Sequence, residues 1–281
     1  MPELPEVETV CRGLAVKLEG RRLRRVIQRR PDLRFPLPTR FAARLQGRRI
    51  LRIDRRAKYI LIHLDDDNVI LAHLGMSGSM IVDTAPVTEF DRHDHIIFET
   101  EDGTAIRFND ARRFGFMHLV ALRDLDRHPL LAKLGPEPLS TAFDGGALAA
   151  ALAGKKTSIK AALVDQRVVA GIGNIYASES LYRAGISPRR LAKTVQGQRA
   201  DRLAAAVKQV LTEAIAAGGS SLRDFVQTNG ELGYFQHRWA VYEREGKPCP
   251  ECDCGAPAAG GGVRRIVQTG RSTFFCPRRQ R

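Results

Sequence analysis

The hydrophobic pattern of the chain changes once, after Leu134, and this change limits the folds that the chain can adopt. Before it, apolar residues gather in short runs of strand length, separated by turn signals at residues 65–68 and 101–103. After it, apolar residues recur at helical spacing in stretches rich in Ala and Leu. We find no internal repeat. The sequence therefore predicts an α+β protein with a β-sandwich half and a helical half.

The same pattern predicts the individual elements. An amphipathic helix is expected over the first twenty residues, because Val7, Val10 and Leu14 fall on one face and Gly20 follows as a stop. Strands are expected at 59–64, 69–74, 95–98 and 105–108, and helices at 144–153, 157–165, 174–184 and 198–217. The expected domains are a β-sandwich with its flanking helix over 1–130, a linker over 131–145, a helical domain over 146–240 and a C-terminal hairpin over 241–281.

The charge of the chain points to a polyanionic partner. Its 281 residues hold 45 Lys and Arg against 31 Asp and Glu, a net charge of +14. Such an excess favours nucleic acid, since bound Lys and Arg release counterions from the phosphate backbone. Fifteen basic residues lie between Arg21 and Lys58 with only two acids, and the apolar residues among them indicate a folded basic surface. An anionic membrane and simple solubility are the alternatives, although no basic amphipathic helix is visible.

The N-terminus has neither the basic region nor the apolar region of a secretory signal, so a cytoplasmic location is expected. Four of the five cysteines lie together near the C-terminus: Cys249, Cys252, Cys254 and Cys276. In a cytoplasmic protein, such a cluster predicts a metal site before it predicts disulfides.

Pro2 is the first residue that could carry out chemistry. Removal of Met1 would leave a secondary α-amine, whose pKa near 8 leaves much more of it unprotonated than a lysine. A helix start would lower this pKa further, and attack on a sugar carbon would give an iminium ion that permits elimination. Glu3 could serve as a general acid and base beside it. The alternative is that Pro2, Glu3 and Glu6 merely suit the start of a helix.

The opening sequence Met-Pro-Glu-Leu-Pro-Glu-Val-Glu-Thr resembles the N-terminal signature of the formamidopyrimidine-DNA glycosylases, bifunctional enzymes that remove 8-oxoguanine and ring-opened purines. Further blocks resemble the same family, in the same order, over nearly the whole chain. They begin at Arg55 (RRAKY), His73 (HLGMSG), Arg92 (RHDH), Ala111 (ARRFG), Leu134 (LGPEPL), Gly171 (GIGNIYASE) and Gly270 (GRSTFFC). One block would be weak, whereas the ordered set is specific.

The resemblance implies base-excision repair of damaged double-stranded DNA by a cytoplasmic monomer without a membrane partner. The enzyme would be a glycosidic hydrolase that releases oxidised purines and a lyase that cuts the abasic strand by β,δ-elimination. Pro2 would be the Schiff-base nucleophile and Glu3 the acid and base at the sugar. Lys58 would be a second proton-transfer and phosphate-binding group, and Arg271 would assist elimination.

The resemblance also implies a set of DNA contacts. Met76, Arg112 and Phe114 would enter the duplex where the damaged nucleotide leaves and refill the gap. By pattern alone, Met76 and Phe114 would more often belong to the core. The other implied contacts are His93, Lys155, Lys160, Asn174 and Tyr176. A helix–two-turn–helix is implied over 157–184, where the helix that starts at Asn174 could point N–H groups at a phosphate.

The cysteines depart from the family pattern of two CxxC pairs. Cys249-Pro-Glu-Cys252 is intact, but the second pair reads Cys276-Pro-Arg-Arg279, and arginine cannot ligate a metal. We predict one zinc ion held by Cys249, Cys252, Cys254 and Cys276, with Cys254 in place of the missing ligand. The alternative is a hairpin without zinc that apolar side chains hold together.

Two rival functions remain. The related endonuclease VIII branch prefers oxidised pyrimidines but usually has Gly where this chain has Leu4. A non-catalytic DNA-binding finger protein would have no need of Pro2, Glu3 and Lys58 together. N-terminal sequencing would separate catalysis from binding alone, because a retained Met1 would block the amine.

Overall fold

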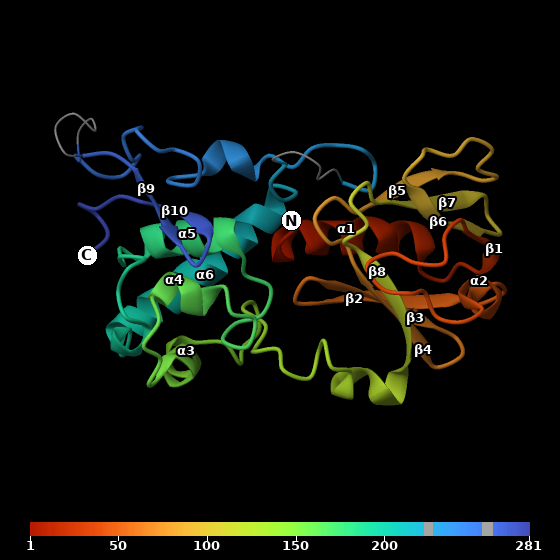
Figure 1. Ribbon diagram of the computed structural model, residues 1–281, viewed down its shortest axis with the longest axis horizontal. Coiled ribbons are helices and arrows are strands. Elements are labelled where there is room, and N and C mark those ends of the chain that lie inside the picture. Colours follow the sequence, from red (N-terminus) through yellow and green to blue (C-terminus); the bar gives the residue numbers. More distant parts are fainter. Residues whose placement is uncertain (222–226, 255–260) are drawn as a thin grey trace. The chain divides into compact units, whose positions relative to one another are not determined.

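The computed structural model describes residues 1–221, 227–254 and 261–281. The chain divides into two compact units (Figure 1). Unit 1 comprises Met1–Ala132 and Ile215–Gln236, and unit 2 comprises Lys133–Ala214 and His237–Arg281. The four-segment division drawn from the sequence remains a prediction. Among the described residues, no helix is both long and apolar enough to cross a membrane.

Within the described part of unit 1, a long helix, α1 (Leu4–Leu18), accompanies two antiparallel sheets of four strands each. One sheet has the order β2-β3-β4-β8 and the other β1-β6-β7-β5. The bounds are β1 (Leu23–Gln28), β2 (Ile50–Arg56), β3 (Tyr59–Leu64), β4 (Asn68–His73), β5 (Ser79–Thr84), β6 (Asp94–Thr100), β7 (Thr104–Asn109), β8 (Phe116–Ala121), α2 (Phe41–Leu45) and the 3-10 helix η1 (Leu122–Arg127). The four strands predicted from the sequence are β3, β4, β6 and β7, and the predicted sandwich is confirmed.

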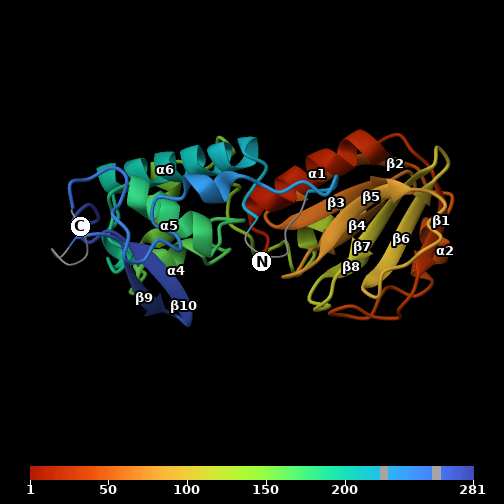
Figure 2. The ribbon, with the colours of Figure 1, turned by 90° about the horizontal axis from the view of Figure 1, so that it is seen from above.

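The core of unit 1 lies between the two sheets and α1. Leu14 of α1, Ile62 of β3 and Phe98 of β6 belong to one buried apolar cluster. The helix runs along β2 (Figures 1 and 2), where the Arg55 Nε donates to the Glu8 carboxylate at 2.8 Å. The apolar stripe of α1 therefore closes the sandwich along β2.

Unit 2 contains the predicted helices and hairpin. The helices are α3 (Gly145–Leu152), α4 (Ile159–Leu163), α5 (Asn174–Arg183) and α6 (Gln198–Ala216), with the 3-10 helices η2 (Ala192–Thr194) and η3 (Phe235–Arg238), and the hairpin is β9 (Arg264–Gln268) with β10 (Arg271–Phe275). The last two residues of α6 and the first two of η3 belong to unit 1. β10 packs beside α5 (Figure 2). The sequence prediction of a helical half with a C-terminal hairpin is confirmed.

A buried carboxylate ties α5 to the start of the C-terminal finger, the name used here for residues 241–281. Glu179 is 1% exposed and accepts the backbone N–H groups of Ala240, Val241 and Tyr242 at 2.9, 3.0 and 2.8 Å. Burial raises the pKa of this carboxyl group, while the three donors stabilise its charged form. These three hydrogen bonds therefore fix the start of the finger against α5.

Replacement of Glu179 by Gln should destabilise unit 2. The amide NH2 would face backbone donors, and a buried N–H without an acceptor costs free energy, so we expect a loss of about 2 kcal/mol or more. Thermal and urea unfolding would measure it. Glu243→Gln is the matched control, because this exposed residue lies in the same segment. Equal stability of the two variants would contradict the role given to Glu179.

Candidate active site and nucleic-acid interface

The N-terminal turn of α1 is buried and tightly held. Pro2, Glu3 and Glu6 are all buried. Glu3 starts the helix in a reciprocal capping box: its N–H donates to Glu6 Oε2 at 2.8 Å, and its side chain accepts the Glu6 N–H. The predicted nucleophile and acid–base group therefore occupy a fixed position.

The second oxygen of Glu6 reaches a distant segment. Glu6 Oε1 accepts the backbone N–H of Ser220 at 2.8 Å. Gly219, next to it, has φ +80°, and a Cβ there would lie 3.0 Å from the same oxygen, so both its conformation and the close approach require glycine. Sequence reasoning treated Glu6 only as a helix-start carboxylate. The signal it could have used is the pair Gly218-Gly219 after α6.

Lys58 lies in the tight turn between β2 and β3 and is only 6% exposed. Burial, the charge of Lys58 and the charge of Arg34 lower the pKa of His73 to about 4. The Gly75 N–H donates to His73 Nδ1 at 2.9 Å, which fits a neutral ring. Since β2 packs against α1, the turn with Lys58 and the helix start with Pro2 and Glu3 come from elements in direct contact. A buried amine, a carboxylate and an ammonium group can together carry out nucleophilic and proton-transfer chemistry.

The three predicted gap-filling residues lie at the surface of unit 1. Met76 is 37% exposed and Phe114 44% exposed, so neither belongs to the core. The Arg112 guanidinium lies over the Phe114 ring at 4.8 Å. Gly75, at φ +64°, lets the Met76 turn approach Phe114, because a Cβ there would lie 2.3 Å from the Phe114 carbonyl carbon.

Asp110 holds the surface residues of unit 1 together. Its fully buried carboxylate accepts the Ser77 hydroxyl at 2.6 Å and the Gly115 N–H at 2.8 Å, and its own N–H donates to the His93 carbonyl at 3.1 Å. Three separate sequence blocks thus converge on one residue, two on its carboxylate and one on its backbone N–H. Sequence reasoning missed Asp110, although it directly precedes one of the blocks.

In unit 2 the predicted contacts centre on Asn174, the first residue of α5. Lys160 Nζ donates to Asn174 Oδ1, and Asn174 Nδ2 donates to the Ser272 carbonyl at 2.9 Å and the Tyr242 hydroxyl at 3.3 Å. Lys160 and Tyr176 are fully buried. Lys160 is therefore placed to orient Asn174.

Lys155 and Arg271 also lie in unit 2 and are accessible. Lys155 is half-buried, one turn before α4, and Arg271 is exposed at the turn between β9 and β10. Both can present their charge to a ligand.

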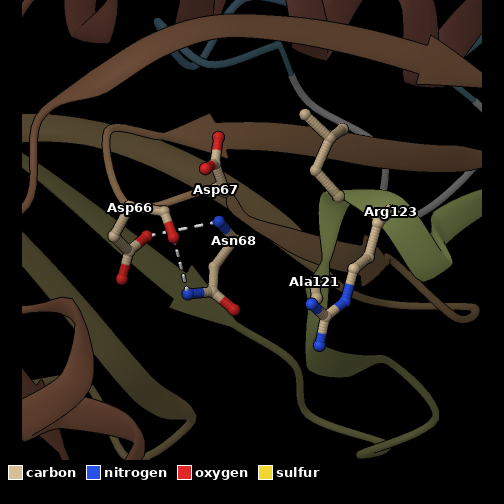
Figure 3. Close-up of a pocket in the computed structure, with 6 residues that line it drawn as sticks. Asp66, Asp67, Asn68, Ala121 and Arg123 are labelled. Carbon is tan, nitrogen blue, oxygen red and sulfur yellow. Dashed lines mark hydrogen bonds between the residues drawn. The ribbon is translucent and has the colours of Figure 1, made fainter.

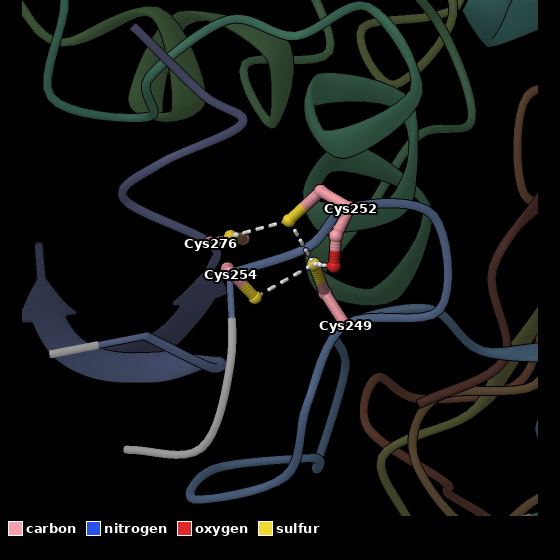
Figure 4. A group of neighbouring side chains, drawn as sticks. All are labelled: Cys249, Cys252, Cys254 and Cys276. Carbon is pink, nitrogen blue, oxygen red and sulfur yellow. Dashed lines mark hydrogen bonds between the residues drawn. The ribbon is translucent and has the colours of Figure 1, made fainter. Parts of the chain in front are cut away.

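The structure brings the four C-terminal cysteines together (Figure 4). Their sulfur atoms all lie within 4.8 Å of one another, with separations of 2.7 Å for Cys249–Cys252, 3.2 Å for Cys249–Cys254 and 3.6 Å for Cys252–Cys276. Four thiolates around a zinc ion lie ~3.8 Å apart. Burial opposes ionisation of Cys254, but hydrogen bonds from Cys249, Cys252 and the Gly262 N–H outweigh it and lower its pKa to about 6. The cluster can hold a metal ion.

Arg279, at the position of the missing family cysteine, binds elsewhere in the finger. Its guanidinium lies 4.7 Å from the Tyr182 ring centroid and pairs with the Glu251 carboxylate at 2.8 Å. It also donates to the carbonyls of Glu251 and Tyr182 at 3.1 and 3.3 Å. Arginine therefore joins the Cys249–Cys252 turn to α5 without touching a sulfur atom.

A hollow at the Asn68 end of β4 contains none of the predicted site residues (Figure 3). It is lined by Asp66, Asp67, Asn68, Ala121, Leu122 and Arg123. The backbone N–H of Asn68 donates to Asp66 Oδ1 at 3.3 Å, and the Leu122 N–H donates to the Asp67 carbonyl at 2.8 Å. These hydrogen bonds stabilise a turn. The carboxylates of Asp66 and Asp67 would repel a polyanion, so this hollow is not a candidate site for DNA.

Comparisons with known proteins agree with this geometry. The family model of the formamidopyrimidine-DNA glycosylase N-terminal domain matches residues 1–117, and that of the formamidopyrimidine-DNA glycosylase H2TH domain matches residues 134–226. The formamidopyrimidine-DNA glycosylase of Rhodospirillum centenum is 62% identical over 291 residues, with complete coverage of both chains. That of Acidiphilium cryptum is 59% identical over 281 residues, again with complete coverage.

Solved structures give the same result. The crystal structure of MutM (Fpg) from Thermus thermophilus has a TM-score of 0.85 and 43% identity, over 99% of this chain and 98% of that one. Lactococcus lactis Fpg in complex with DNA containing an abasic site has a TM-score of 0.88 and 30% identity, over 99% of each chain. The chain is an enzyme that belongs to the formamidopyrimidine-DNA glycosylase family.

Proposed function

We propose that the protein excises oxidised purines, such as 8-oxoguanine and formamidopyrimidines, from duplex DNA and then cuts the abasic strand. The observation that carries this proposal is the buried start of α1, where the capping box fixes Pro2 and Glu3 and Lys58 lies on an adjoining element. Membership of the family and the solved complex of a relative with abasic-site DNA support it. An oxidised purine is preferred to an oxidised pyrimidine because Leu4 departs from the endonuclease VIII pattern.

The first chemical step uses the amine of Pro2 after removal of Met1. The nitrogen lone pair attacks the anomeric carbon of the damaged nucleotide, and the base leaves with the electron pair of the N-glycosidic bond and takes up a proton. Opening of the sugar ring gives an iminium ion on Pro2. The positive end of the α1 dipole favours the unprotonated amine at neutral pH.

The later steps are eliminations from that iminium ion. It accepts the electrons of the adjacent C–H bond when a base removes the proton, and the 3′ phosphate then leaves; a second elimination expels the 5′ phosphate. Glu3 transfers protons at the sugar. Lys58 transfers protons and binds phosphate, and Arg271 stabilises the departing phosphate charge.

The surface residues open and hold the duplex. An extruded base leaves a gap, which Met76, Arg112 and Phe114 fill with apolar and stacking groups. Their exposure and the Arg112–Phe114 stacking support this role. His93, Lys155, Lys160, Asn174 and Tyr176 bind the DNA, and Lys160 also orients Asn174 through its hydrogen bond to Oδ1.

The finger holds one zinc ion through Cys249, Cys252, Cys254 and Cys276. The donor set suits this ion, since zinc takes four soft ligands in a tetrahedron. Its contribution would be structural, by fixing the hairpin that carries Arg271. The pairing of Arg279 with Glu251 joins the same turn from outside the sulfur cluster.

Borohydride should trap a covalent adduct between Pro2 and an 8-oxoguanine duplex, which mass spectrometry of the peptides would locate. A tag fused ahead of Pro2 should abolish trapping, because it converts the amine to an amide, while DNA binding largely survives. The same tag at the C-terminus is the control. Attachment at a lysine would refute Pro2 as the nucleophile, and an oxidised-pyrimidine duplex that traps better than 8-oxoguanine would refute the purine preference.

Met76→Ala, Arg112→Ala and Phe114→Ala should each slow excision from duplex DNA more than cleavage of a preformed abasic site. Removal of one stacking group costs about 1–3 kcal/mol, or roughly 5- to 150-fold in rate. Single-turnover assays on both substrates would measure the difference. Leu51→Ala, at another exposed apolar residue of unit 1, is the control. Equal loss on both substrates would disprove gap filling.

Purified wild-type protein should contain about one zinc per chain, and Cys254→Ser should lose most of it, because three thiolates form a weaker, open site. Elemental analysis would measure the content. Cys11→Ser is the control, since Cys11 lies in α1 with its thiol on the Asp54 carbonyl. Full zinc content in Cys254→Ser would exclude Cys254 as a ligand, and a zinc-free wild type would exclude the site.

A further inference from the structure

Much of the positive charge of the basic stretch 21–58 is neutralised within unit 1. Hairpin turns and neighbouring strands bring acids to it, each within 4.0 Å of an arginine. The pairs are Arg21–Asp102, Arg22–Asp65, Arg25–Glu99, Arg30–Asp32, Arg48–Asp66, Arg52–Asp54 and Arg55–Glu8. Folding therefore supplies acidic partners for at least seven of the fifteen basic residues in this stretch.

Unit 2 contains three segments without a single acid: residues 154–164, 185–200 and 263–281, with three, four and six Lys or Arg respectively. These segments lie against one another. The Lys193 N–H donates to the Lys155 carbonyl at 3.1 Å, and the Ile159 N–H donates to the Arg190 carbonyl at 2.7 Å. The Gln268 side chain at the hairpin tip donates to the Pro188 carbonyl at 3.2 Å. The middle segment thus joins the one with Lys155 to the one with Arg271.

The middle segment forms a hollow lined by Ser187, Arg189, Arg190, Leu191 and Thr194. Neither Arg189 nor Arg190 forms an ion pair with any other residue that the structure describes. The Nε of Arg190 is buried and has no hydrogen-bond partner among those residues. Arg189 rests over the Phe275 ring, 5.2 Å from its centroid.

We propose that this 187–194 hollow binds a backbone phosphate of the DNA duplex, beyond the phosphates that Lys155 and Arg271 of the same unit contact. The inference rests on the proposed function, because the neighbouring Lys155 and Arg271 are DNA contacts only there. A buried guanidinium donor without a partner is costly, and a phosphate satisfies it. Arginine also matches phosphate oxygens with two parallel N–H groups, and two arginines face this hollow.

A purely structural role is the competing explanation. Arg189 could serve only to cover Phe275, and Arg190 only to pack its stem. Removal of either would then lower the unfolding temperature and leave DNA affinity unchanged for the variant that still folds. The two explanations therefore differ in the salt dependence of binding.

The test uses the full-length protein and a series of duplexes with a central 8-oxoguanine, shortened stepwise from each end. Arg189→Gln and Arg190→Gln should each weaken binding to the longest duplex several-fold. Each should also reduce the slope of log affinity against log salt by about one, the value expected when one phosphate is no longer neutralised. On duplexes too short to reach the hollow, the variants should match wild type in affinity and in borohydride trapping. Arg123→Gln removes the same charge at an 87% exposed site of unit 1 and should not change the slope.

Four results would overturn the proposal. The first three are an unchanged slope on the longest duplex, an equal loss on every duplex, and a wild-type affinity that does not depend on duplex length. A fourth would be an unchanged slope together with stabilisation of wild type, but not of Arg190→Gln, by inorganic phosphate, which would indicate a small-anion site. Absence of trapping on the shortest duplex with wild type would count against the proposed function instead.

Discussion

The start of helix α1 depends on one carboxylate, that of Glu6. Glu6 accepts the Glu3 N–H through one oxygen and the Ser220 N–H through the other, so that it holds the first turn of α1 against the segment after α6. A buried carboxylate is tolerated only when its oxygens are satisfied, and here two backbone donors satisfy it. Any shift of the helix start would break both bonds, so the fold gives Pro2 and Glu3 a defined place. The orientation of the proposed nucleophile is thus built into the fold.

The secondary structure was largely predictable because it follows from short-range periodicity. The spacing of apolar residues alone predicts that β3 and β6 are strands and that α1 is a helix. The contacts of the site were less accessible, because they join distant residues: Glu6 and Ser220 are 214 positions apart. The role of Asp110 was hidden for the same reason, because two of its partners, Ser77 and His93, are distant in the sequence. The burial of Lys160 was also not predictable, because a lysine in a basic segment is normally expected at the surface.

The distribution of charge also could not be predicted from composition alone. Counting residues places the basic surface at 21–58, yet folding supplies partners for many of these arginines. In unit 2 the segments that meet around Pro188 contain no acid of their own. Arg265 and Arg279 pair with Glu245 and Glu251 outside them, whereas Arg189 and Arg190 form no ion pair with any residue that the structure describes. Local net charge therefore depends on which strands and turns pack together, and only the structure gives that. Arg279 illustrates the same rule, because its charge is bound to Glu251 and Tyr182.

The position of Glu179 has a consequence for how this architecture can vary. The three donors that satisfy it come from residues 240–242, at the root of the finger, while the carboxylate itself belongs to α5. Loss of the finger would leave the buried Glu179 carboxylate with only the Ala240 donor, and a finger moved to another protein would carry the Val241 and Tyr242 donors without their acceptor. The finger and α5 therefore depend on each other: a change of the hairpin tip leaves these bonds intact, whereas an exchange of the whole finger breaks two of them.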